Sequence, residues 1–448
     1  MENKNKLTSG NIDKSLIKLS LPLIVTALVQ VAYNFVDMLY LGRLGTEVVA
    51  GAGIAFFIFW FAISLSIIPK VGMGVFASRA YGSGNDKDTI RVIHNGLILS
   101  LFIGLIYTFL IFLFGDFFID QFSLSSNASY YGKEYLFYSG FGIILFIINP
   151  VISQAFIAIS NPLIPFIFNS LGAVVNIIID PIMIFGLGPI PGLGVKGAAI
   201  ATGLGQLVVI LGFMFVSFRK SGLIKEALIS YDFQLYWIVD IFKLGLPAGI
   251  LSGFQYIVTI ILNGYTSIFG DMAVAVTAIG HQIESITWNT SDAIQVGIQA
   301  LVGQNFGAGN KDRVRDAIKA SLRLTISIGF VSGLVLFFFR YQLMEIFVVN
   351  DIETIKLGAM YLTIASLSQV FFSAESGATG IFNGLMDAKT PSMVGLIFNF
   401  IKILLSLILL NIFGVAGIWI SITLTSICKG LIDIILLKKR IKKDFANF

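Results

Sequence analysis

The chain is dominated by apolar runs of about 20 residues, the length that an α-helix needs to cross the hydrocarbon core of a bilayer. Hydrophobic residues make up 56% of the sequence and charged residues only 12%, about half of the charged fraction of ordinary soluble domains. One soluble core cannot bury this much apolar surface, and a backbone in lipid must satisfy its own hydrogen bonds. The sequence therefore predicts an all-α polytopic membrane protein.

Twelve runs have the length and polarity of transmembrane helices. We expect them at residues 15–38, 48–77, 91–115, 133–155, 163–185, 197–218, 243–268, 273–302, 316–339, 357–383, 392–412 and 415–437. An even number of spans puts both termini on one side. Of the 30 Lys and Arg residues, 22 lie in segments on that side and 5 on the other. The positive-inside rule predicts a cytoplasmic-membrane protein with both termini in the cytoplasm.

The two halves of the chain resemble each other. KLSLPL at 18–23 returns as KLGLPA at 243–248, and ASRAYGSGNDKD at 77–88 aligns with VGQNFGAGNKDR at the same shift of 225 residues. We expect two pseudo-symmetric six-helix lobes, 1–218 and 243–448, joined by a cytoplasmic linker at 219–242. Parallel repeats of this kind are typical of secondary transporters, which bind their substrate between the halves near the membrane midplane.

The sequence contains no G-x-x-x-x-G-K-[S/T] loop that would hold a nucleotide phosphate. Transport would then draw its energy from an ion gradient or from the membrane potential. We expect no cofactor and no nucleic-acid partner. The expected partners are small molecules, H⁺ or Na⁺, and the lipid bilayer; whether the protein acts as a monomer stays open.

The first half carries two acids inside apolar runs, Asp37 and Asp180. Asp180 lies in VVNIIIDPIMIFG, one helical turn after Asn176 and directly before Pro181, which removes a backbone donor and is expected to loosen that turn. A carboxylate at bilayer depth costs about 3 kcal/mol or more. Crowded carboxyl groups in low dielectric can share a proton near neutral pH. The pair predicts a proton-coupling site, with Na⁺ as the other candidate ion; alternatively, each acid only hydrogen-bonds a neighbouring helix.

Helical spacing puts Gln30, Asn34 and Asp37 on one face of the first span. Asn34 and Asn176 are therefore expected to bring amide groups to the same site. Lys70, which follows a proline in the second span, either extends towards the interface or neutralises an acid.

The second half carries different ionisable groups. Glu284 and His281 lie one turn apart in the eighth span, and Glu375 lies in the tenth. We expect these three side chains to contact a cationic substrate, or alternatively the coupling ion, in a central cavity. With two histidines in the whole chain, we expect no metal at His281. For Asp292, two turns further along the same span, pairing with a basic residue is the alternative to a contact in the cavity.

Several segments together resemble the multidrug and toxic compound extrusion (MATE) family over residues 14–437. They are LSLPLI, YNFVDMLYLGRLG, ASRAYGSGN, VVNIIIDPIMIFG, KGAAIAT, LVGQNFGAGN and GIFNGLMDAKTP. The resemblance implies a V-shaped pair of six-helix lobes that exports cationic or amphipathic compounds in exchange for protons or sodium ions. It also implies a role in antibiotic resistance and no enzyme activity.

The resemblance extends to single positions. DinF-type members keep an aspartate in span 1, an asparagine and an aspartate in span 5, and a threonine in span 6. These correspond here to Asp37, Asn176, Asp180 and Thr202. NorM-type members have a glutamate in span 7 where this chain has Gln255, and an acid in span 10 near Phe372. The resemblance therefore favours the acids of the first half, and leaves Gln255 as a candidate substrate contact.

Two other functions are considered. A lipid-linked oligosaccharide flippase of the same superfamily would need a cationic cavity for phosphate, but basic residues at depth are nearly confined to Lys70, Lys402 and Lys429. A membrane-embedded lipid-modifying enzyme would place clustered acids or histidines at the membrane edge, where the sequence has no such cluster.

Overall fold

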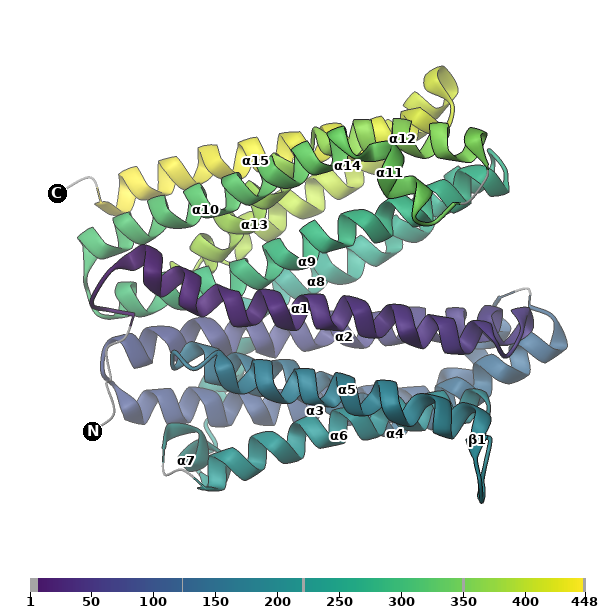
Figure 1. The fold of residues 1–448 in the computed structure, drawn as a ribbon. Coiled ribbons are helices and arrows are strands. Elements are labelled where there is room, and N and C mark those ends of the chain that lie inside the picture. The colour runs from purple at the N-terminus through teal and green to yellow at the C-terminus, as the bar shows by residue number, and fades with distance from the viewer. Residues whose placement is uncertain (1–6, 123, 220–221, 349–350, 446–448) are drawn as a thin grey trace. The chain divides into compact units, whose positions relative to one another are not determined.

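The computed structural model describes residues 7–122, 124–219, 222–348 and 351–445. Nearly all of them are helical, because long apolar segments satisfy their backbone hydrogen bonds internally. The helices are α1 (Ile12–Gly42), α2 (Thr46–Gly82), α3 (Asp86–Asp120), α4 (Ser126–Ala158), α5 (Leu163–Phe185), α6 (Val195–Arg219), α7 (Leu223–Ile229), α8 (Leu235–Ser267), α9 (Asp271–Gly307), α10 (Lys311–Phe338), α11 (Arg340–Glu345), α12 (Ile352–Ser366), α13 (Gln369–Gly384), α14 (Lys389–Phe413) and α15 (Val415–Phe445) (Figure 1). A short antiparallel hairpin joins α5 to α6; its two strands, β1 (Gly186–Leu187) and β2 (Ile190–Pro191), have two residues each.

Ten of the described helices are long and apolar enough to cross a membrane, and the bent pair α12–α13 would make an eleventh span. α9 lies at the position of the predicted eighth span and is 37 residues long, but it is not among these ten helices. It carries polar groups that include Glu284 and Asp292. The multi-pass all-α architecture predicted from the sequence is confirmed.

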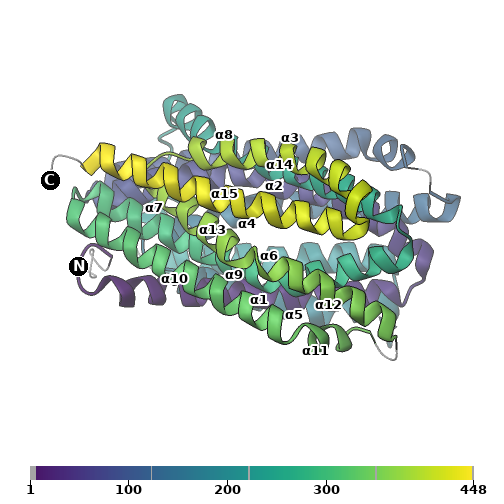
Figure 2. The same cartoon turned by 90° about the horizontal axis from the view of Figure 1, so that it is seen from above.

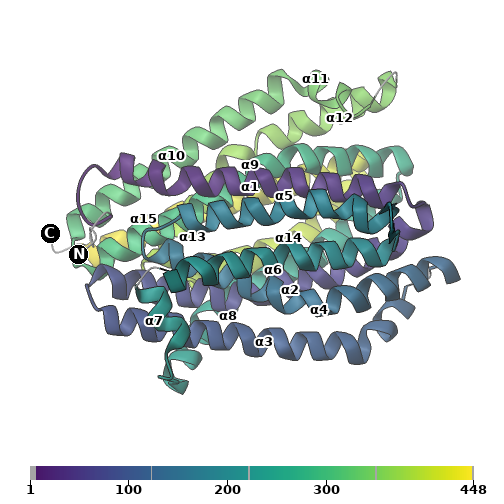
Figure 3. The same cartoon turned by 60° about the horizontal axis from the view of Figure 1, so that its bottom comes forward.

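The structure adds detail to two predicted segments. The tenth span, expected as one helix at 357–383, is broken between α12 and α13, which meet at 44°. Figure 3 shows α12 near α11. The segment 219–242, expected as a linker, contains α7 and the first turns of α8. Apolar residues inside that segment, among them Ile224 and Ile241, are buried in a hydrophobic core. Their burial stabilises the helical structure of the segment.

The chain forms two compact units. One is Val25–Gly249, in which α2 packs against α3 and α4, and α6 against α4 and α5. The other combines Ile250–Phe448 with the chain up to Ile24, and in it α13 packs against α9, α10 and α15. α14 and α15 run side by side in this second unit (Figures 1 and 2). The unit boundaries thus fall inside α1 and α8, which differs from the predicted division at 1–218 and 243–448.

Close contacts explain these boundaries. A Cβ atom on Gly245 would lie 1.9 Å from the carbonyl oxygen of Ile68, so the first half of α8 packs backbone to backbone against α2. At the other end of the chain, the side chain of Arg313 donates to the carbonyl oxygens of Leu7 and Gly10. These contacts fasten the start of α1 to α10.

Candidate functional site

The two acids of the first half come together inside the unit Val25–Gly249. Asp37 of α1 is 5% exposed and Asp180 of α5 is fully buried. Their carboxyl groups lie close enough to interact with each other, and neither oxygen of Asp180 meets a donor group among the described residues. Two ionised carboxylates repel each other and cannot hydrogen-bond, so a proton on one of them would relieve the repulsion. A buried pair of this kind is chemically able to change its charge by taking up one cation.

Close packing of α5 on α6 positions Asp180 and its neighbour Asn176. A Cβ atom on Gly205 would lie 3.1 Å from both the Cβ of Asn176 and the carbonyl oxygen of Gly172, so the two backbones approach closely where these small residues meet. The Asn176 amide nitrogen is 3.5 Å from the hydroxyl oxygen of Thr202, which itself donates to the carbonyl of Ala198 at 2.9 Å. α5 and α6 run side by side (Figures 1 and 3). The predicted residues Asn176, Asp180 and Thr202 are therefore neighbours.

Two tyrosines complete the surroundings of the acids. Tyr33, one turn before Asp37, is buried with its hydroxyl within hydrogen-bond range of Thr202. Tyr135 of α4 is also buried and interacts electrostatically with both acids. Neither was predicted; the one-turn spacing to Asp37 could have revealed Tyr33, whereas nothing in the sequence connects Tyr135 to the site.

A small polar pocket adjoins the site. Its lining includes Gln30, Tyr33, Asn169, Asn176, Thr202 and Gln206. The Asn149 amide nitrogen of α4 donates to Gln206 at 2.7 Å and to Asn169 at 3.0 Å, which links α4, α5 and α6 through amide groups. These three amides were not predicted from the sequence, because they are scattered over three helices and have no common spacing.

The buried oxygens would also suit Na⁺, which prefers oxygen ligands as other hard cations do. The side-chain oxygen of Asn176 is buried without a hydrogen-bond partner, as are those of Asp180 and one of Asp37. Among the described residues, no group of three or more His, Cys, Asp or Glu side chains could hold a metal ion. The carboxyl and amide oxygens of the site are groups that a proton or Na⁺ can bind.

One expectation for this site differs from the structure. Asn34 is exposed, and its side-chain oxygen accepts from the amide of Gln30 at 3.1 Å, so it does not join the buried acids. The reason is geometric: at about 100° per residue, Tyr33 and Asn34 point in different directions and only Tyr33 faces the core. Pro181 lies inside α5, which continues to Phe185, and the loosening of its turn stays a prediction. Lys70 is half-buried in α2, and both of its predicted roles stay predictions.

Glu284 lies in the interior of the second unit, which differs from its predicted place on a cavity wall. It is 4% exposed and accepts hydrogen bonds from the hydroxyl of Tyr361 and, at 2.7 Å, from the amide of Gln369. Both carboxylate oxygens are thus used inside the unit. His281 is half-buried and its ring packs 6.1 Å from that of Tyr361. The predicted pair joins α9 to α12.

The structure also gives the surroundings of the other candidates in this unit. Glu375 is bound by Lys429, with 2.9 Å between its Oε1 and the Lys429 Nζ. Asp292 accepts from the hydroxyl of Ser376 at 3.3 Å. Gln255 is exposed on α8, and nothing in its surroundings tests its role. A further buried acid, Asp433 of α15, was missed because it lies close to the basic end of the last helix.

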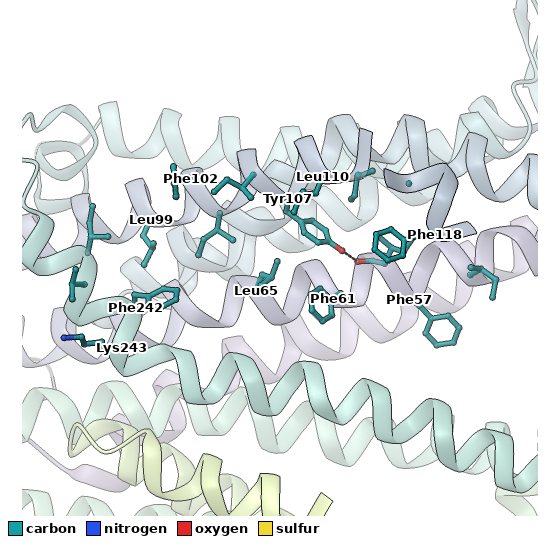
Figure 4. Close-up of a pocket in the computed structure, with 18 of the residues that line it drawn as sticks. Phe57, Phe61, Leu65, Leu99, Phe102, Tyr107, Leu110, Phe118, Phe242 and Lys243 are labelled. Atoms are coloured by element: carbon teal, nitrogen blue, oxygen red, sulfur yellow. Dashed lines mark hydrogen bonds between the residues drawn. The ribbon is translucent and has the colours of Figure 1, made fainter. Parts of the chain in front are cut away.

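A separate apolar cavity of about 1000 Å³ lies between α2, α3 and the first turns of α8 (Figure 4). Phe57 and Phe61 of α2, Phe102 of α3 and Phe242 of α8 are among its lining residues. The Tyr107 hydroxyl donates to the carbonyl of Ile58 at 2.6 Å across it. It contains no acid among its described lining residues, so it is distinct from the Asp37–Asp180 site.

The MatE family model matches the chain twice, at residues 22–182 and 247–408. The two matches start 225 residues apart, which equals the shift of the internal repeat.

Curated relatives match over almost the whole chain. The chain is 28% identical to a probable multidrug resistance protein NorM of Thermotoga maritima, over 92% of this chain and 89% of the relative. It is 24% identical to a FAD transporter of Shewanella oneidensis over 96% and 95%. It is also 24% identical to the multidrug export protein MepA of Staphylococcus saprophyticus over 98% and 97%.

Solved structures share the fold. A multidrug resistance MATE family transporter of the MOP superfamily, in its outward-facing conformation, has a TM-score of 0.91 at 21% identity, with 99% of this chain and 98% of that chain covered. A Pyrococcus furiosus transporter of the same superfamily, described as having a binding pocket of reverse polarity, has the same TM-score at 20% identity, with the same coverage of both chains. The chain belongs to the MatE family of membrane transporters.

Proposed function

We propose that this protein is a secondary active efflux transporter that exports cationic or amphipathic small molecules in exchange for H⁺ or Na⁺. The observation that carries the proposal is the contact between the buried carboxyl groups of Asp37 and Asp180. It supplies a group whose charge depends on a bound cation. Relatives named multidrug resistance and multidrug export proteins support this class of substrate.

In the proposed cycle, uptake of one cation by the acid pair neutralises it, and its release restores the negative charge. Asp37 and Asp180 stand on different helices, so their charge state changes the attraction between α1 and α5. An ion drives transport only if it binds the two conformations with different affinity. The amide groups of Asn149, Asn169 and Gln206 lie next to this switch and would orient water or the ion. We further propose that the protein lies in the cytoplasmic membrane with both termini inside.

The test uses the purified full-length protein in proteoliposomes loaded with ethidium. An imposed inward proton gradient, or separately an inward sodium gradient, should accelerate ethidium release from the correctly oriented fraction. Liposomes without protein are the control for passive leak. An ethidium release rate that is the same with and without either gradient would contradict the proposal.

The same liposomes also test whether the protein transports a different class of substrate. The FAD transporter among the relatives makes an anionic dinucleotide a specific alternative substrate. Release of FAD, with no release of ethidium, would assign the chain to that class instead. Movement of a fluorescent lipid-linked sugar between leaflets would identify the flippase alternative.

The role of Glu284 gives a further prediction. If its carboxylate serves the hydrogen bonds from Tyr361 and Gln369, then Glu284→Gln should keep most of the folding and of the transport, because an amide replaces one acceptor and can donate to the tyrosine oxygen. Glu284→Ala should lower the stability by about 2 kcal/mol, since it leaves two buried polar groups unpaired. Melting temperature in detergent and ethidium efflux are the measurements. A folded Glu284→Gln variant without any efflux would show instead that the negative charge is needed.

A further inference from the structure

A second group of ionisable side chains lies inside the unit that contains Ile250–Phe448. Lys429 of α15 binds Glu375 of α13 at 2.9 Å, with the two side chains 8% and 16% exposed. Lys402 of α14 interacts electrostatically with both of them and donates to Asn399 at 3.1 Å. α14 and α13 both pack against α15 (Figure 2). Three helices thus bring two lysines and a glutamate together within one unit.

Asp433 adds a buried acid whose carboxyl group has no hydrogen-bond partner in the described part of the chain. It lies four residues after Lys429 on the same face of α15 and is fully buried. Neither of its carboxyl oxygens has a hydrogen-bond partner among the described residues, and Glu375 Oε2 is likewise buried without one. Taking an ionised carboxylate out of water in this way is far more unfavourable than burying the neutral acid. Burial therefore favours the neutral acid at Asp433.

The two charges beside Asp433 act on it in opposite directions. Glu375, like burial, favours the neutral acid, whereas the ammonium of Lys429 favours the carboxylate. α12, which also packs against α15, contributes the titratable Tyr361, whose hydroxyl is bonded to Glu284. Asp292 of α9 is bonded to Ser376 of α13. Lys429 is therefore the group that would stabilise Asp433 once it has lost its proton.

We propose that Asp433, Lys429 and Glu375 form a proton-binding centre in this unit, separate from the Asp37–Asp180 site. Asp433 gains and loses the proton, and Lys429 is the counter-charge that it shares with Glu375. On release, the Asp433 O–H bond breaks, water accepts the proton as hydronium, and the ammonium of Lys429 moves from Glu375 towards the new carboxylate. Lys429 stays charged throughout. The inference concerns proton binding itself and does not depend on the proposed efflux function.

The experiment is infrared difference spectroscopy on the full-length protein in liposomes, between mildly acidic and mildly alkaline pH. The C=O stretching band of a protonated carboxyl group reports each acid that titrates. Asp433→Asn should remove one such band, whereas Asp433→Glu should shift it. Lys429→Met should retain the band to more alkaline pH, because the counter-charge is gone. As the matched control, Asp37→Asn should remove a different band and leave that of Asp433.

A folded Asp433→Asn variant with an unchanged difference spectrum would overturn the proposal. If that variant does not fold, Asp433→Glu is the test instead. Its C=O stretching band must shift in frequency if the titrating carboxyl group is at this position. Circular dichroism and gel filtration establish folding for each variant. A spectrum in which Lys429→Met leaves the titration range of the band unchanged would likewise overturn the role of Lys429.

Discussion

Substitution of Asp37 or Asp180 by asparagine should reduce ion-driven ethidium efflux to the level of liposomes without protein. Each change removes one carboxyl group of the buried pair while keeping the size of the side chain. The remaining acid has no second carboxylate beside it, so its affinity for a proton or cation no longer depends on how close α1 and α5 bring the two groups, and ion uptake no longer distinguishes the two conformations. Binding of ethidium to the purified protein should persist in part, because the substitutions act on the coupling ion. Efflux in proteoliposomes and fluorescence binding in detergent are the two measurements.

Asp116→Asn is the matched control, because Asp116 lies exposed on α3 of the same unit. It should show normal efflux. A loss of efflux in Asp37→Asn or Asp180→Asn counts only when the variant elutes as a monodisperse protein with native helicity. Normal ion-driven efflux in both variants would remove the acid pair from the coupling mechanism.

Substitution of Lys429 by methionine should lower the free energy of unfolding by about 3 kcal/mol, the lower range for breaking a buried ion pair. The methionine keeps most of the apolar stem but leaves the Glu375 carboxylate without its partner. The double variant Glu375→Met with Lys429→Met should recover most of this loss, because neither member of the ion pair is then left without the other. Denaturation in mixed micelles, followed by circular dichroism, measures both.

Lys133→Met is the comparison for this prediction. Lys133 and Asp120 are 2.7 Å apart, a similar distance to that between Lys429 and Glu375, but their side chains are 31% and 53% exposed. Water screens such a pair, so the change should cost no more than about 1 kcal/mol. Equal losses at Lys429 and at Lys133 would contradict the argument that burial gives the Lys429 pair its importance.

The sequence by itself determined the membrane class, the internal repeat and the two acids of the first half. Hydrophobic length and charge are properties of the chain alone, and helical periodicity relates residues only along one helix. The spacing of Asn176 and Asp180 was therefore readable, and so was the pattern of apolar runs. The broken span was not, because the separation of α12 and α13 has no proline or glycine at 366–369 to indicate it.

The tertiary structure decided which polar groups meet across helices. It brought Tyr135 of α4 next to Asp37 and Asp180, turned Asn34 outward, and placed Glu284 in the interior of its unit. It also revealed Asp433 beside the Lys429–Glu375 pair. These contacts join residues tens to more than a hundred positions apart. They depend on which face each helix turns to its neighbours, and that choice is made by packing, in which small residues such as Gly172 and Gly205 set how closely two helices approach.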